Sequence, residues 1–84
     1  MAEITVYSTS YCPNCIKVKQ LLQKKNRDFT EIDLTNDDSG RLELVKKSGG
    51  RKTVPQVFID GMHIGGCDDL YELDAKGELD PLLA

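Results

Sequence analysis

The chain has 84 residues, enough for one small domain, which we expect to span residues 1–84. Hydrophobic residues make up 39% of the chain and its net charge is −3, which excludes a disordered composition and disfavours a nucleic-acid-binding protein. Apolar runs reach three residues at most, as at 57–59, and the N-terminal residues have no basic or long apolar segment. We therefore expect a cytoplasmic protein that contacts neither membrane nor nucleic acid.

The first half of the chain alternates between strand and helix patterns. Residues 3–8 carry apolar side chains at alternate positions, which predicts a β-strand. Residues 13–25 repeat apolar residues every three or four positions among lysines, which predicts an amphipathic helix. Residues 29–34 predict a second strand, and residues 37–48 predict a second helix that ends at two glycines.

The second half predicts a hairpin followed by a helix. Residues 56–60 form a strand with a continuous apolar middle, an Asp-Gly pair provides the turn, and residues 62–64 return. Two glycines then break the strand, a third helix covers about 67–76, and a last short turn covers 80–83.

This order of elements predicts an α/β fold. The β-α-β-α half implies parallel strands joined by a helical crossover, and the hairpin adds antiparallel strands. We expect a mixed four-stranded sheet flanked by helices, in the order β-α-β-α-β-β-α. The loops after the strands should then bring residues 11–15, 53–55 and 66–69 together.

The chain has three cysteines, Cys12, Cys15 and Cys67. An odd number argues against a disulfide framework, in which cysteines are paired. In a reducing compartment, cysteine pairs tend to be catalytic or metal-binding. The Cys-x-x-Cys pair at positions 12 and 15 follows a predicted strand and opens a predicted helix, the context in which such a pair indicates redox chemistry.

The local chemistry gives the two cysteines different roles. Pro13 suits the first helical position and keeps the residue before it extended, so Cys12 should be the N-cap residue. The free backbone N–H groups and the helix dipole there stabilise a thiolate, the nucleophilic form of cysteine. Cys15 lies one turn later on the same face, placed to attack a mixed disulfide formed at Cys12.

Two further segments have features of a ligand site. Pro55 can open a strand, and the extended residue before it, Val54, has a backbone that could pair with an incoming peptide. After two glycines, the N-terminus of the third helix suits a carboxylate, and Asp68 suits an ammonium group. Taken alone, each segment is more simply explained as an ordinary strand start or helix start.

Taken together, the segments Cys12-Pro13-Asn14-Cys15, Thr53-Val54-Pro55 and Gly65-Gly66-Cys67-Asp68-Asp69-Leu70 resemble those of bacterial dithiol glutaredoxins. The resemblance covers nearly the whole chain. It implies a thioredoxin-like fold, a cis peptide bond before Pro55, Cys12 as nucleophile and Cys15 as resolving cysteine. It also implies a glutathione site, for which the matching residues are Tyr11, Asn14, Thr53, Val54, Pro55, Gly66, Cys67 and Asp68.

The function implied by the resemblance is glutathione-dependent thiol–disulfide exchange. The protein would reduce disulfide-containing and glutathionylated proteins as a monomer, with glutathione as cosubstrate and no bound cofactor. Two positions depart from the commonest pattern of the family, since Asn14 replaces an aromatic residue and Thr9 replaces a lysine. Both lie on the glutathione side of the site, where Tyr11 would supply aromatic surface.

Three alternatives remain open at this point. The protein could be reduced directly by thioredoxin reductase, although Asp68 favours glutathione. It could hold a two-iron, two-sulfur cluster between two subunits, although Pro13 stands where cluster-binding relatives carry a small residue. It could also be a zinc module built from Cys12, Cys15, His63 and Cys67, without the usual ligand spacing; His63 otherwise reads as a surface strand residue.

Overall fold

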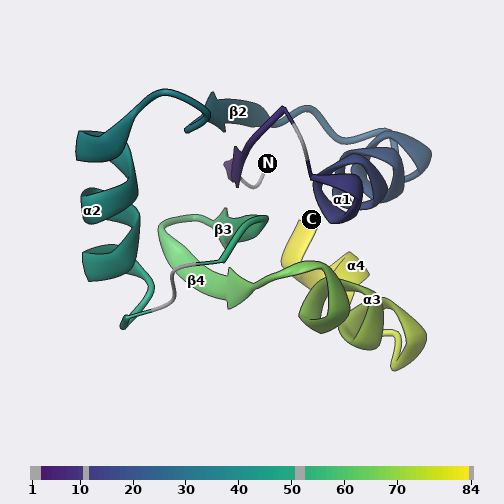
Figure 1. The fold of residues 1–84 in the computed structure, drawn as a ribbon. Coiled ribbons are helices and arrows are strands. Elements are labelled where there is room, and N and C mark those ends of the chain that lie inside the picture. Colours follow the sequence, from purple (N-terminus) through teal and green to yellow (C-terminus); the bar gives the residue numbers. More distant parts are fainter. Residues whose placement is uncertain (1–2, 11, 51–52, 84) are drawn as a thin grey trace.

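The computed structural model describes residues 3–10, 12–50 and 53–83, and Figure 1 shows their arrangement. The predicted strands and helices are all present, with bounds close to those expected. The last segment, expected as a turn, is a short helix instead. The elements are β1 (Ile4–Ser8), α1 (Pro13–Lys24), β2 (Thr30–Asp33), α2 (Asp38–Lys47), β3 (Gln56–Ile59), β4 (Met62–Gly65), α3 (Cys67–Ala75) and α4 (Leu79–Leu83).

The strands form one mixed sheet in the order β2-β1-β3-β4, which confirms the predicted fold class. Strand β1 pairs in parallel with β2 and antiparallel with β3, and β3 pairs antiparallel with β4. The β3–β4 turn is made by Asp60 and Gly61, whose φ angles of 52° and 78° are both positive. An Asp-Gly pair suits this turn because aspartate tolerates the left-handed region and glycine adopts it freely.

The two faces of the sheet carry separate cores. Helices α1, α3 and α4 lie on one side of the sheet in Figure 1, and α2 lies on the other. Strand β1 contributes to both cores. Ile4 and Val6 belong to the core shared with α1, α3 and α4, and Tyr7 belongs to the second core, shared with α2. The second core is small: Leu34, Leu44 and Phe58 are its other buried members.

The helices on the larger face bury most of the apolar surface. Val18 and Leu22 of α1 and Leu70 of α3 have no exposed surface, and neither does Leu79 of α4, while Leu83 is 1% exposed. Full burial of one such side chain stabilises the fold by about 1.5–3 kcal/mol. No helix in the described ranges is long and apolar enough to cross a membrane.

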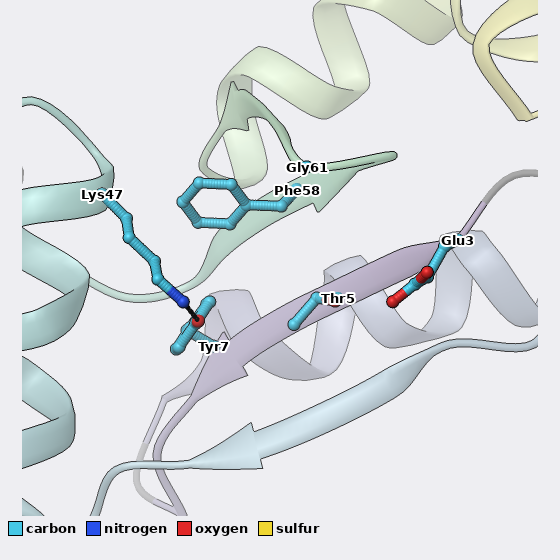
Figure 2. Close-up of a pocket in the computed structure, with 6 residues that line it drawn as sticks. All are labelled: Glu3, Thr5, Tyr7, Lys47, Phe58 and Gly61. Carbon is cyan, nitrogen blue, oxygen red and sulfur yellow. Dashed lines mark hydrogen bonds between the residues drawn. The ribbon is translucent and has the colours of Figure 1, made fainter.

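Helix α2 covers its face of the sheet incompletely. A cavity of about 340 Å³ lies between the helix and the strands. Figure 2 shows the residues that line it, with Lys47 extending from α2 toward Tyr7. The Lys47 ammonium donates a hydrogen bond to the Tyr7 hydroxyl at 3.3 Å. The cavity is lined by Glu3, Thr5, Tyr7, Lys47, Phe58 and Gly61.

Candidate active site

Cys12 occupies the N-cap position of α1, as predicted. Its backbone is extended, with φ −105° and ψ 106°, and Pro13 begins the helix. The Cys15 backbone N–H donates a hydrogen bond to Cys12 Sγ at 3.2 Å. The half-buried Cys12 thiol in turn donates to the Val54 carbonyl at 3.5 Å. The sulfur therefore sits at the positive end of a helix, where negative charge is stabilised.

Cys15 has a different environment one turn later. Its side chain is fully buried, and both it and Cys12 are free thiols. Burial, followed by the hydrogen bond with Cys12, raises the pKa of Cys15 to about 12. A backbone hydrogen bond from Thr9 and the positive charge of Lys19 act in the opposite direction. Cys15 is therefore protonated at neutral pH.

The Val54-Pro55 peptide bond is cis, as the resemblance implied. The loop before it is held by the fully buried side chain of Gln56, which donates hydrogen bonds to the carbonyl and hydroxyl oxygens of Thr53 at 3.0 and 3.2 Å. The oxygen of the Gln56 side-chain amide, Oε1, lies 2.7 Å from His63 Nε2. His63 lies on the returning strand as expected, but it is half-buried against Phe58 rather than at the surface. Through Gln56, His63 therefore supports the Thr53–Val54 loop that contacts Cys12.

A glycine pair leads from β4 into α3. Gly65 has φ 130°, and a Cβ at this position would collide with the Asp69 side chain. Asp69 accepts a hydrogen bond from the Gly66 N–H at 3.0 Å and so caps the helix. Asp69 lies within the segment singled out from the sequence, but its capping role was not predicted, although a side-chain acceptor three positions after an N-cap is a known capping pattern. Asp68, beside it, is exposed.

The three segments predicted to converge do so around one cavity of about 390 Å³. Cys12 adjoins this cavity through its contact with the Val54 carbonyl. Tyr11, predicted to take part in the site, lies outside the described residues. The residues that line the cavity are Asn14, Thr53, Val54, Pro55, Gly66, Cys67, Asp68 and Asp69.

Comparison with known proteins identifies the family. Residues 4–64 match the glutaredoxin family model. The chain is 52% identical to Glutaredoxin 3 of Escherichia coli K12 over 83 residues, which cover 99% of both chains. It is also 52% identical to Glutaredoxin 1 of Rickettsia prowazekii over 81 residues, which cover 95% of this chain and 85% of the relative. The chain belongs to the glutaredoxin family.

Solved structures of glutaredoxins have the same fold. A buckwheat glutaredoxin–glutathione complex superposes with a TM-score of 0.88 at 36% identity, covering 98% of this chain and 76% of the other. The solution structure of a Brucella melitensis glutaredoxin gives a TM-score of 0.86 at 44% identity, covering 99% and 89%. The thioredoxin-like fold expected from the sequence is therefore confirmed.

Family membership also gives the activity class of this glutaredoxin. Glutaredoxins are thiol–disulfide oxidoreductases, and this one carries the two thiols of a Cys-x-x-Cys pair close together at the start of α1. It is therefore a thiol–disulfide oxidoreductase. Within the part of the chain that the structure describes, no three His, Cys, Asp or Glu side chains are grouped to hold a metal ion. The four residues of the zinc alternative are thus not gathered as a ligand set.

Proposed function

We propose that this glutaredoxin reduces protein disulfides and protein–glutathione mixed disulfides, with Cys12 as the nucleophile and Cys15 as the resolving thiol. The observation that carries the proposal is the contrast between the two sulfurs. Cys12 Sγ is half-buried at a helix N-terminus and accepts a backbone N–H, whereas Cys15 is fully buried. An accessible, stabilised thiolate attacks first, and a buried thiol can react only with a sulfur brought to its neighbour.

In the first step, the Cys12 thiolate attacks a disulfide of the substrate. A bond forms between Cys12 Sγ and one substrate sulfur, and the other sulfur leaves with the electron pair and takes up a proton. With a protein disulfide, Cys15 then attacks Cys12 Sγ and releases the second substrate thiol. With a glutathionylated protein, Cys12 takes the glutathionyl group, and an external glutathione resolves it without Cys15.

Glutathione would bind across the cavity beside Cys12. The Gly66 N–H already donates to Asp69, so the Cys67 N–H at the start of α3 suits the carboxylate of the γ-glutamyl end, and the Asp68 carboxylate suits its ammonium group. The Val54 backbone would pair with the cysteinyl residue, as in strand addition. A buckwheat relative was solved in complex with glutathione, which supports this assignment.

The remaining residues of the proposed glutathione site are Asn14, Thr53 and Pro55, which line the same cavity, and Tyr11. Asn14 offers an amide where the family commonly has an aromatic ring, so its contact with the ligand would be polar. We further propose that residues 1–84 form a single domain that acts as a monomer in the cytoplasm, with no bound cofactor.

Two assays on the same preparations test the assignment of the cysteines. One follows removal of glutathione from a small mixed disulfide in the presence of glutathione and its reductase, and the other follows reduction of a protein disulfide. Cys12→Ser should abolish both activities. Cys15→Ser should keep or raise deglutathionylation, because the intramolecular disulfide can no longer form, and should lose most protein disulfide reduction. Substantial activity of Cys12→Ser in either assay would show that the nucleophile is another residue.

A further inference from the structure

A polar cluster of three residues lies on the side of α1 that faces the sheet. Ser8 is buried, with 1% of its surface exposed, and its hydroxyl donates a hydrogen bond to Glu31 Oε2 at 2.7 Å. The Lys19 ammonium contacts the same oxygen at 2.7 Å. The three side chains come from β1, α1 and β2, so the cluster joins the catalytic helix to the first two strands of the sheet. The proposed function assigns it no role.

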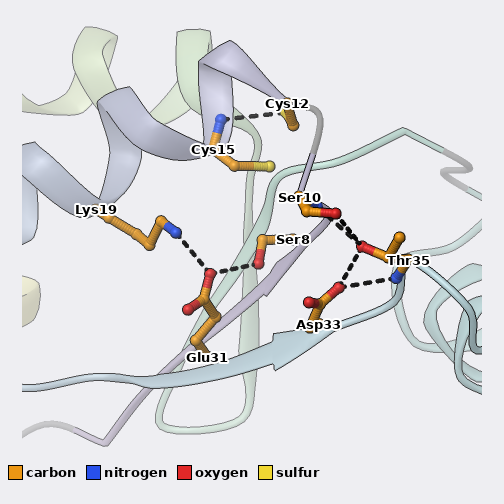
Figure 3. Close-up of polar contacts among 8 residues, drawn as sticks. All are labelled: Ser8, Ser10, Cys12, Cys15, Lys19, Glu31, Asp33 and Thr35. Atoms are coloured by element: carbon orange, nitrogen blue, oxygen red, sulfur yellow. Dashed lines mark hydrogen bonds and ion pairs between the residues drawn. The ribbon is translucent and has the colours of Figure 1, made fainter.

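The cluster adjoins Cys15. Lys19 follows Cys15 by four residues on α1, so the two share one face of the helix. Side chains of a helix tilt toward its N-terminus, which directs the Lys19 chain back toward Cys15. Figure 3 shows the Lys19 ammonium, the Glu31 carboxylate and the Ser8 hydroxyl together on the side of α1 that carries the Cys15 sulfur.

Glu31 keeps the lysine both placed and charged. The hydrogen bond with Glu31 raises the pKa of Lys19, and the hydrogen bond with Lys19, followed by that from Ser8, lowers the pKa of Glu31. Both groups are therefore ionised at neutral pH. The positive charge of Lys19 lowers the pKa of Cys15, against the larger effects of burial and of Cys12. The negative charge of Asp33, which is also on β2, raises the pKa of both Lys19 and Glu31.

We propose that Lys19, held in place by Glu31 and Ser8, is a positioning residue for the resolving step of catalysis, where its ammonium group stabilises the negative charge that the Cys15 sulfur acquires. This inference rests on the proposed function of Cys15. In the step, the Cys15 thiol loses its proton to solvent and its sulfur attacks Cys12 Sγ. A Cys15–Cys12 bond forms, the bond from Cys12 to the substrate sulfur breaks, and that sulfur leaves with the electron pair and takes up a proton.

The test isolates the resolving step. Full-length protein is glutathionylated at Cys12, and the release of glutathione by Cys15 is followed in a single turnover between pH 6 and 10. Lys19→Met keeps the length of the side chain without its charge. It should slow release at pH 7 by about three- to tenfold, the effect of removing one charge near a protein surface, and move the pH profile to higher pH.

Three controls accompany this variant. Lys19→Arg restores the positive charge and should release glutathione within about twofold of the unmodified protein. Lys76→Met removes a charge from the exposed Lys76–Glu72 pair at the C-terminal end of α3 and should leave the release rate unchanged. Steady-state deglutathionylation, which does not use Cys15, should not slow in Lys19→Met, and its persistence shows that the variant is folded.

An unchanged pH profile of release in Lys19→Met would overturn the inference while leaving the proposed function intact. A parallel loss of release and deglutathionylation that Lys19→Arg does not restore would also overturn it, because it would show a purely structural role. Failure of the proposed function appears differently: release in the unmodified protein would then be as slow as in Cys15→Ser.

Discussion

Two residues of the same type, one helical turn apart, acquire different chemistry from their surroundings. Cys12 lies outside the helix because Pro13 follows it, and the Cys15 N–H of the first turn donates to its sulfur. Cys15 lies inside the helix on the face that packs against the sheet, so its thiol is buried. The order of reaction of the two thiols therefore follows from their places at the helix start.

Asp68 is the residue whose charge should matter most for glutathione and least for the thiol chemistry. Asp68→Ala removes the proposed partner of the γ-glutamyl ammonium group, and we expect the Michaelis constant for a glutathionylated substrate to rise roughly tenfold, since an exposed charged hydrogen bond is partly screened. The rate of reduction of a disulfide substrate that contains no glutathionyl group should change little. Glu78→Ala, an exposed acidic residue between α3 and α4, is the control. An unchanged Michaelis constant in Asp68→Ala would remove this residue from the site.

At the scale of elements, the junction of β4 and α3 depends on Gly65. Gly65→Ala forces a residue with a Cβ into φ 130° and against the Asp69 side chain, which would disturb the cap on Gly66. We expect a loss of about 1–3 kcal/mol in the free energy of unfolding, measured by urea denaturation, together with weaker glutathione binding. Gly61→Ala, also at positive φ but with open space around its Cβ, should cost less and leave binding unchanged. Equal losses in both variants would contradict the role given to Asp69.

The elements could be predicted from the sequence because their signals are local. Pro13 after Cys12 marks a helix start, and Asp60-Gly61 between two apolar runs marks a hairpin. The final helix differs from the turn expected over residues 80–83, although Leu79 and Leu83 stand at helical spacing. Such a short helix is stabilised by burial of these two leucines rather than by its own sequence.

The three segments of the site could also be predicted, but the contacts that hold them could not. The links between His63 and Gln56 and between Lys19 and Glu31 join residues on different elements. Periodicity tells which face of a helix is buried, but it does not tell which polar side chains meet across the boundary. Such pairings depend on strand order and register, which the sequence specifies only through the packed fold.

At the scale of the whole molecule, the buried thiol makes folding stability depend on alkaline pH. The pKa of Cys15 is raised from 9.0 to about 12 in the folded protein, and burial also raises that of Cys67. Below pH 9 both states keep the Cys15 proton, so this contribution to stability is fully present. Between about pH 9 and 12 the unfolded chain loses the proton first, which costs the folded state up to about 1.4 kcal/mol per pH unit.

We therefore expect the urea midpoint under reducing conditions to fall between pH 8 and pH 10, an interval below the ordinary lysine pKa of 10.5. Cys15→Ser lacks the titrating thiol and should show a smaller fall. An equal fall in the variant would mean that groups other than Cys15 govern the alkaline stability.

The division of the fold into two unequal cores has a consequence for how the molecule opens. Helix α2 is anchored to the sheet by Leu44, within a cluster of four buried residues, and it stands beside an open cavity. Helices α1, α3 and α4 share the larger core with the central strands. Because few buried residues hold α2 to the sheet, we expect its amide hydrogens to exchange with solvent through a local opening, and those of β1 and β3 to exchange only through unfolding of the whole domain. The α2 face can loosen while the helix that carries the thiols stays in place.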